Sequence, residues 1–397
     1  MLLMLGSLEC LAACGQRLPV RQVMTDAARQ LGLTLEEVNR AAQSDTSVVA
    51  ARSLEDGRPR LVSSDDWTAG FFAGELWLMY EYSHINSWRT AAEKYTARMR
   101  REQWNATTHD MGFKMLPGYG NGYLLTRNPD YRKVLIQSAR TLSRRFNPVV
   151  GCIRSWDHTQ KNWEYPVIID NLMNLELLFA ATRLTGDSSF YHIAVTHANT
   201  TLANQYRPDY SCYHVLDYDT TTGKVLHRTT QQGYSDASAW ARGQSWGLYG
   251  FTMCYRYTGD ERYLRQAEHI ATFLLHHPRL PADKVPCWDY DAPGIPHEPR
   301  DASAAAIMAA ALYELSSYSV HREAYRSAAD TILASLTDHY RSPVGKNDGF
   351  ILLHSTGSFP DHSEIDVPLI YADYYYLQAL LEKEHLDRSG AAGIKNY

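Results

Sequence analysis

The sequence predicts an all-helical protein, an (α/α)6 barrel in which six helical hairpins form two concentric rings. Two kinds of helical segment alternate along the 397-residue chain, one amphipathic and one apolar on every side. They recur at a spacing of roughly 45 to 70 residues, which is typical of stacked helical hairpins. An open helical solenoid is the alternative. A closed ring of six hairpins is preferred because it buries the apolar helices more completely.

The apolar segments are expected to form the inner ring. A helix without a polar face has to be covered on every side, so these segments belong at the centre of the fold. They are residues 71–80, 172–181, 246–255, 303–315 and 370–381.

The amphipathic segments are expected to form the outer ring. Each carries apolar or alanine positions at three- and four-residue spacing with charged residues between them, the pattern of a helix with one buried face. Two of them follow Thr-Gly-Asp sequences at 185–187 and 258–260 and run to about residues 206 and 275. Three more start near Trp88, Tyr131 and Tyr325.

A short β-hairpin is predicted between the helices at residues 211–226. Alternating Tyr213, Val215 and Tyr218 are followed by a turn at 219–223 and then by Val225. Inserts of this kind lie at barrel mouths, where ligands bind. No linker or low-complexity segment appears, so residues 21–397 are expected to be a single catalytic domain.

Residues 1–20 are interpreted as a leader. Residues 2–8 are apolar, and the sequence Leu-Ala-Ala-Cys at 11–14 resembles a lipoprotein cleavage box. A signal peptide should also carry basic residues before the apolar run, and none is present here. The favoured interpretation is export to the periplasm or cell envelope with a lipid anchor at Cys14. The alternatives are a misassigned start codon or a cytoplasmic enzyme. No run reaches the ~18 apolar residues of a membrane-spanning helix.

Composition narrows the classes of ligand. A formal net charge of −5 gives no global basic field for nucleic acid. The 27 Tyr and 9 Trp residues can stack on sugar faces, although large helical cores also use them. The six cysteines include no CxxC pair, and no HExxH sequence occurs, which argues against a zinc site. Their wide spacing also argues against a disulfide framework.

Two aspartates precede apolar helices. Asp170 follows Val167-Ile168-Ile169, and Asp110 precedes residues 111–113. Aspartate is a favoured N-cap, so both could simply cap their helices. Alternatively, an apolar setting would raise the pKa of such a carboxyl, as a general acid requires. Paired carboxylates at a barrel mouth are the usual equipment for cleaving glycosidic bonds.

Four further residues are candidates for binding a sugar. Arg242 and Trp246 share a helix face, where an arginine can grip a carboxylate while a tryptophan stacks on a ring. The competing interpretation is a surface arginine over a core tryptophan. Trp67 could be a second stacking platform or plain core. His197 lies in the middle of an amphipathic helix, where a lone histidine is more often structural.

At these residues the sequence is similar to glycoside hydrolase family 88, the bacterial unsaturated glucuronyl hydrolases. The similarity covers roughly residues 60 to 385 and is carried by long matches in the right order. They are DWTAGFFAGELW from Asp66, HDMGF from His109, IIDNLMN from Ile168, QGYSDASAWARGQSWGLYG from Gln232 and DVPLIYADYYYLQALL from Asp366. The family fold is an (α/α)6 barrel, in agreement with the periodicity.

The resemblance implies roles for individual residues. The family's catalytic aspartate falls on Asp170 and its assisting aspartate on Asp110. Its substrate-binding residues fall on Trp67, Trp156, His197, Gln232, Arg242 and Trp246. Many members have a basic residue before the QGY motif, where this chain has Gln231. Members that favour sulfated substrates carry an S-x-x-S-x-K pattern, whereas here Ser355 and Ser358 are followed by Pro360. We therefore expect unsulfated or lightly sulfated substrates to be preferred.

The implied reaction removes a Δ4,5-unsaturated glucuronic acid from lyase-generated oligosaccharides, of glycosaminoglycans or similar polysaccharides. Asp170 would protonate C4 of the vinyl ether, and water would then add at C5. No metal or organic cofactor is required. Two rivals remain at this stage. One is a family 105 type hydrolase of the same fold acting on unsaturated rhamnogalacturonyl ends. The other is a non-catalytic glycan-binding lipoprotein, which would have no use for two aspartates at the mouths of apolar helices.

Overall fold

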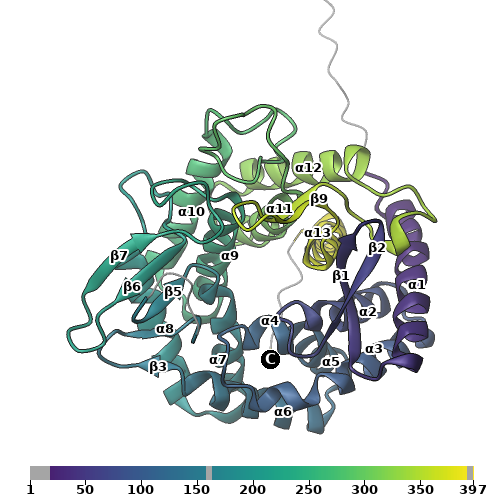
Figure 1. The fold of residues 1–397 in the computed structure, drawn as a ribbon, viewed down its shortest axis with the longest axis horizontal. Helices are drawn as coiled ribbons and strands as arrows, with labels where there is room; N and C mark the ends of the chain where they lie inside the picture. Colours follow the sequence, from purple (N-terminus) through teal and green to yellow (C-terminus); the bar gives the residue numbers. More distant parts are fainter. Residues whose placement is uncertain (1–17, 158–162, 391–396) are drawn as a thin grey trace, which may run out of the picture.

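The computed structural model describes residues 18–157, 163–390 and 397. Within this part of the chain the helices form two rings around a common axis (Figure 1). The inner ring consists of α2 (Ala69–Ser83), α4 (Met111–Met115) with α5 (Asn121–Thr126), α7 (Asn171–Thr185), α9 (Ala241–Thr258), α11 (Ala302–Ser316) and α13 (Ile370–Ser389). The outer ring consists of α1 (Val20–Ser44), α3 (Asn86–Arg98), α6 (Pro129–Ser143), α8 (Ser188–Asn204), α10 (Glu261–His276) and α12 (Arg322–His339).

The inner helices close on themselves. Each packs against the next, from α2 through α4, α7, α9, α11 and α13 back to α2. All five segments that the sequence identifies as apolar lie in this ring, and every residue of α11 is buried. Small residues allow close approach, since a Cβ on Gly250 of α9 would meet Leu172 Cβ of α7 at 2.5 Å. The (α/α)6 prediction is therefore confirmed, and the open solenoid is not observed.

The Thr-Gly-Asp sequences form the turns from an inner helix to an outer one. Gly186 and Gly259 end α7 and α9 in the left-handed conformation, with φ of 76° and 67°. Such φ values favour glycine because it has no Cβ. Asp187 and Asp260 then cap α8 and α10 by accepting hydrogen bonds from backbone N–H groups two residues on. The same sequence signal thus marks the same corner in two hairpins.

The second inner helix is interrupted. A π-helical turn, η2 (Leu116–Gly120), separates α4 from α5. Two short 3-10 helices lie elsewhere, η1 (Arg100–Trp104) and η3 (Asn347–Gly349). The helix expected after Asp110 is present, but its interruption and α1 were not predicted. Pro117 and three nearby glycines obscure the helical periodicity beyond residue 115.

Within the described ranges the strands form four small antiparallel sheets. β1 (Val48–Glu55) pairs with β2 (Arg58–Ser63), β3 (Phe146–Asn147) with β4 (Cys152–Ile153), and β8 (Ser355–Ser358) with β9 (Ser363–Val367). The predicted hairpin is present as β6 (Val215–Tyr218) and β7 (Val225–Thr229). A third strand, β5 (Pro166–Ile168), joins it next to β6 and leads into α7 through Ile169 and Asp170.

The predicted leader lies almost entirely outside the described residues, and so does its Cys14. Its last residue, Val20, begins α1. No helix in the described ranges is long and apolar enough to cross a membrane.

Candidate active site

The N-terminal ends of the inner helices meet at one end of the barrel. Arg242, at the start of α9, pairs with Asp301 before α11, with 2.8 Å between Nη1 and Oδ2. Its guanidinium carbon also lies 5.4 Å from the ring centre of Tyr371, in the first turn of α13. Tyr371 in turn contacts Trp67, which precedes α2, with ring centres 5.0 Å apart. Four separate hairpins therefore bring their chemically active side chains together.

Asp170 occupies the N-cap position of α7 but does not cap the helix with its side chain. Its carboxyl is buried, and Oδ2 accepts no hydrogen bond from the described residues. Burial raises the pKa of Asp170 to about 7; nearby Arg242 opposes this shift and the charge of Asp110 adds to it. A carboxyl with such a pKa carries a transferable proton at neutral pH, as a general acid needs.

Asp110 also precedes its helix, α4, without capping it. One carboxylate oxygen, Oδ2, accepts a hydrogen bond of 2.7 Å from the Thr108 hydroxyl. The other, Oδ1, lies 3.3 Å from Nε2 of the buried His109. Burial lowers the pKa of His109, which keeps the imidazole neutral at pH 7. Asp110 is thus held in place next to Asp170 as the second acidic group.

His214 faces Asp170 and was not identified from the sequence. Its Nδ1 accepts the backbone N–H groups of Gln231 at 3.1 Å and Gln232 at 3.2 Å. The proton of the neutral ring must therefore be on Nε2. Nε2 lies 3.8 Å from Asp170 Oδ2, slightly beyond hydrogen-bond distance. The only sequence signal was its position at the start of the predicted hairpin.

Aromatic rings line two sides of the aspartates. Trp156 is half-buried and stacks on Trp163 at 5.7 Å, with its ring edge-on to His214 at 6.1 Å. Its backbone bridges to Thr108, next to Asp110. Trp67 is also half-buried and packs between Tyr371 and Phe113. These two tryptophans keep part of their surface available for a sugar.

Gln232 and Arg242 bind the same strand, β8. Gln232 Nε2 donates to the carbonyl oxygen of Gly357 at 3.0 Å. Arg242 donates to the carbonyl oxygens of Thr356 and Gly357 as well as to Asp301, and it is only 1% exposed. Because its guanidinium already donates to three acceptors inside the protein, Arg242 holds β8 and Asp301 in place and is not free to bind a substrate carboxylate.

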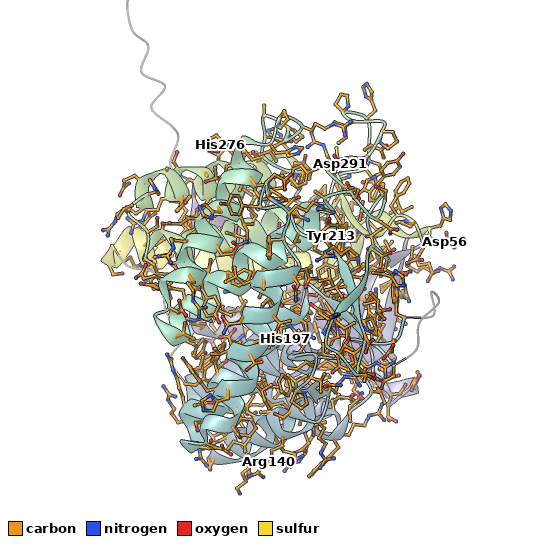
Figure 2. All side chains as sticks on the ribbon, turned by 90° about the vertical axis from the view of Figure 1, so that its left-hand side faces the viewer. Asp56, Arg140, His197, Tyr213, His276 and Asp291 are labelled. Carbon is orange, nitrogen blue, oxygen red and sulfur yellow. The ribbon has the colours of Figure 1, made fainter. Side chains whose placement is uncertain are left out.

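Two sequence-based expectations change in the structure. Trp246 is fully buried against Phe113 and Tyr375, so it supports the site from below and presents no face for stacking. His197 is also fully buried; its Nδ1 accepts the backbone N–H of Ile153, and burial lowers its pKa to about 3. It lies on the outer helix α8 (Figure 2), behind the site wall, because the buried face of that helix packs on β4. The expectation that His197 contacts the substrate directly is therefore wrong.

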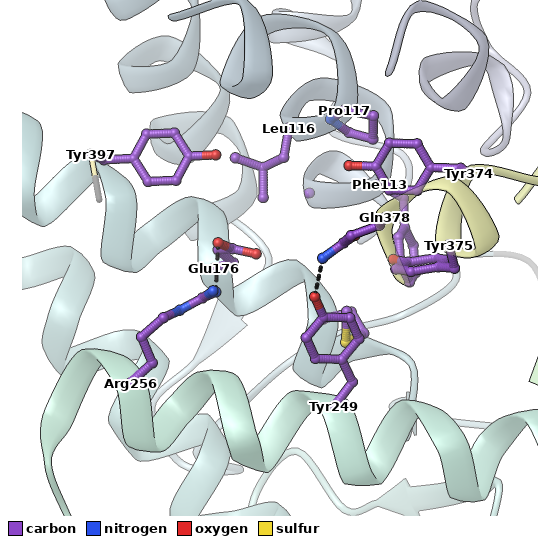
Figure 3. A pocket seen from close by; sticks show the side chains of 12 residues that line it. Phe113, Leu116, Pro117, Glu176, Tyr249, Arg256, Tyr374, Tyr375, Gln378 and Tyr397 are labelled. Carbon is purple, nitrogen blue, oxygen red and sulfur yellow. Dashed lines mark hydrogen bonds and ion pairs between the residues drawn. The ribbon is translucent and has the colours of Figure 1, made fainter. Parts of the chain in front are cut away.

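Further along the barrel axis, a buried ionic network fills the interior (Figure 3). Arg256 donates to Glu176 at 2.8 Å and to Glu314 at 3.1 Å, and Gln378 donates to Tyr249. The cavity beside these groups has a volume of about 40 Å³, enough for little more than a water molecule. This cavity is therefore too small for a sugar ring.

The chain is similar to individual known proteins, although no model of a protein family matches it. It is 48% identical over 329 residues to an unsaturated glucuronyl hydrolase of Formosa agariphila, covering 82% of each chain. It is 34% identical over 329 residues to an unsaturated chondroitin disaccharide hydrolase of Streptococcus pneumoniae, covering 81% of this chain and 82% of that one. The crystal structure of an unsaturated glucuronyl hydrolase specific for heparin superposes with a TM-score of 0.87 at 45% identity, covering 94% of this chain and 98% of that one.

Proposed function

The chain belongs to the unsaturated glucuronyl hydrolases, and from this premise we propose that it hydrates the C4=C5 double bond of a terminal unsaturated glucuronic acid with Asp170 as acid and base. The observation that carries this assignment is the buried Asp170 carboxyl, which does not cap its helix and whose pKa is raised to about 7. The protein is a glycoside hydrolase acting on oligosaccharides that lyases produce.

The first step is protonation of the vinyl ether. Protonated Asp170 transfers its proton to C4, and positive charge develops over C5 and the ring oxygen. The negative charge of Asp110, held by Thr108, lies near this developing charge and stabilises it. The Nε2–H of His214 faces the Asp170 carboxylate that remains and stabilises its ionised form.

The second step adds water. The Asp170 carboxylate takes a proton from water as the oxygen bonds to C5, which restores the acid and gives a hemiketal. The hemiketal opens to a ketone at C5 and a hemiacetal at C1, which then expels the next sugar as an alcohol. One carboxyl that both gives and takes a proton works best with a pKa near the working pH.

The substrate class is a glycosaminoglycan-type oligosaccharide. The names of the relatives from Formosa agariphila and Streptococcus pneumoniae support a glucuronyl over a rhamnogalacturonyl end. The preference between sulfated and unsulfated substrates depends on the residues beside the site. Gln231, where other members place a basic residue, donates to both oxygens of Asp361 at 3.2 and 3.4 Å. A carboxylate at this position supports a preference for unsulfated substrates, because an unpaired sulfate would be repelled.

The N-terminal interpretation also stays a proposal. Residues 1–20 are proposed to be a leader that directs export and lipid attachment at Cys14, ahead of one catalytic domain at 21–397. Metabolic labelling with radioactive palmitate tests it. Label in the wild-type protein that is lost in Cys14→Ala would support an envelope lipoprotein, and unlabelled wild-type protein would refute it.

The function is tested with unsaturated disaccharides produced by chondroitin, hyaluronan, heparin and gellan lyases. Loss of the ultraviolet absorbance of the conjugated double bond reports turnover. We expect turnover of at least one glucuronyl disaccharide without added metal or cofactor. Absence of turnover across the panel would refute the proposed function, and turnover of an unsaturated rhamnogalacturonyl disaccharide alone would favour the rival activity.

A further inference from the structure

A second polar cleft lies outside the aspartate site and has no part in the mechanism above. It has a volume of about 350 Å³ and lies where α6 ends and β3 begins. Arg144, Arg145, Arg154, Asp157 and Tyr165 line it. Three arginines against one aspartate make the cleft locally cationic, in a chain whose formal net charge is −5.

Arg145 and Asp157 form the fixed wall of this cleft. Arg145 binds the carboxylate of Asp157 through two nitrogens, at 2.9 and 2.8 Å. Its Nε donates to the carbonyl oxygen of Arg154 at 2.9 Å, and its side chain is 5% exposed. A bidentate pair of this geometry is rigid, and it uses the charge of Asp157 to compensate Arg145.

The other two arginines are less well compensated. Arg154 forms only a long ion pair with Asp157, with 4.0 Å between Nε and Oδ1, and its Nε donates to no atom of the described residues. It lies over the ring of Tyr165, with 5.9 Å to the ring centre, and its side chain is 32% exposed. Arg144 is exposed and forms no ion pair within the described ranges. Two guanidinium groups are thus available to a carboxylate or sulfate, whose oxygens they match in geometry.

The cleft and the aspartate site share a wall. Ala106 lines the cleft, and Thr108, two residues on, binds Asp110. In the same way Arg154 lines the cleft and Trp156 lies beside His214. A backbone bridge between Thr108 and Trp156 joins the two segments. Two residues of extended chain span about 7 Å, so both sites are within reach of one oligosaccharide.

We propose that this cleft is an accessory subsite for an acidic group, a carboxylate or a sulfate ester, on a sugar beyond the bond that is cut. It acts only in substrates longer than a disaccharide. Phe146 gives the sugar ring an apolar surface, and Arg144 and Arg154 pair with its charge. The inference rests on the proposed function, since it assigns a longer substrate to the same enzyme.

The test compares unsaturated disaccharides with unsaturated tetrasaccharides of the same series. Arg154→Gln and Arg144→Gln, singly and together, remove the charges of these two arginines. Arg140→Gln is the matched control, because Arg140 is an exposed arginine on the same helix, α6, that does not line the cleft. We expect KM for the tetrasaccharide to rise roughly threefold to fivefold in each single variant and roughly tenfold in the double variant, with kcat unchanged. The kcat/KM for the disaccharide should stay at the wild-type value and thereby show that each variant is folded.

Two substrate series identify the acidic group. A rise in KM with hyaluronan tetrasaccharides, which carry only carboxylates, assigns the subsite to the uronate. A rise confined to sulfated chondroitin tetrasaccharides assigns it to the sulfate. The inference is overturned if KM changes equally for both lengths, if no variant changes it, or if Arg140→Gln has the same effect. Disaccharide turnover by the wild-type protein is judged separately, so failure of the subsite is distinct from failure of the proposed function.

Discussion

Replacing Asp170 by Asn should stabilise the fold above neutral pH. The folded-state pKa of about 7 lies above the model value of 3.8 for an aspartate in the unfolded chain. The folded protein therefore binds an extra proton between these values, and ionising Asp170 destabilises it increasingly as pH rises through this window. A shift of this size corresponds to about 4 kcal/mol, fully present above pH 7. Asparagine has nearly the same shape and does not ionise, so Asp170→Asn removes the cost.

The magnitude should depend on pH. At pH 8 we expect the variant to gain up to about 4 kcal/mol, which for a chain of this length is a rise in Tm of about 5 °C. At pH 5 the gain should fall to about 2 kcal/mol, because the folded carboxyl is then protonated, and the remaining cost is that of binding this proton at a pH only about one unit above the unfolded-state pKa. Thermal unfolding of wild type and variant at both pH values measures the difference.

Asp187→Asn is the matched control. Asp187 caps the outer helix α8 from the surface, and asparagine caps helices equally well, so this variant should keep the wild-type Tm within a degree or two at both pH values. An Asp170→Asn variant that is less stable than wild type at pH 8, or whose gain does not decrease toward pH 5, would refute the buried, proton-binding description of Asp170.

Three other perturbations test separate parts of the structure. Asp110→Asn should reduce kcat strongly and leave KM nearly unchanged; it should also move the basic limb of the pH–rate profile to lower pH, because the charge of Asp110 raises the pKa of Asp170. A raised KM with normal kcat would instead make Asp110 a substrate ligand. Arg256→Met should destabilise the fold by about 3–5 kcal/mol in denaturant unfolding, since it leaves Glu176 and Glu314 buried without their cation; an unchanged midpoint would contradict the network. Asp361→Asn should raise the ratio of kcat/KM for sulfated to that for unsulfated chondroitin disaccharides above the wild-type ratio. An unchanged ratio would show that Asp361 does not influence the preference for sulfate.

The fold was predictable to the extent that burial is periodic. Five inner helices are apolar on every side, and such helices have to be covered on every side, as they are at the centre of a helical ring. The inner helix at residues 111–126 carries no such signal, because Pro117 and the adjacent glycines replace one α-helical turn by a π-helical one. Helix α1 was not predicted. It packs on β1 and on η3, and its Gln30 side chain donates to the backbone of Phe350, 320 residues away, a contact that local sequence does not reveal.

The site was predictable where chemistry coincides with a helix start. Asp110 and Asp170 both precede inner helices, so their meeting at the mouth follows from the barrel itself. His214 could not be found this way, since only the folded sheet brings a residue next to β6 toward α7. The local sequence around His197 resembles the family's helix, but its burial behind β4 depends on tertiary packing. Arg242 was predicted to bind a substrate carboxylate. Its enclosure could not be predicted, because its acceptors at Thr356 and Gly357 lie more than 100 residues further along the chain.

The most direct test of the central claim is the turnover of an unsaturated glucuronyl disaccharide by Asp170→Asn. Loss of the double-bond absorbance is followed at saturating substrate, with the unfolding experiment above showing that the variant is folded. We expect kcat to fall by more than about 10⁴-fold, because one group supplies the proton in the first step and removes one in the second. A folded variant that keeps turnover within tenfold of wild type would show that Asp170 is not the acid and base of this reaction.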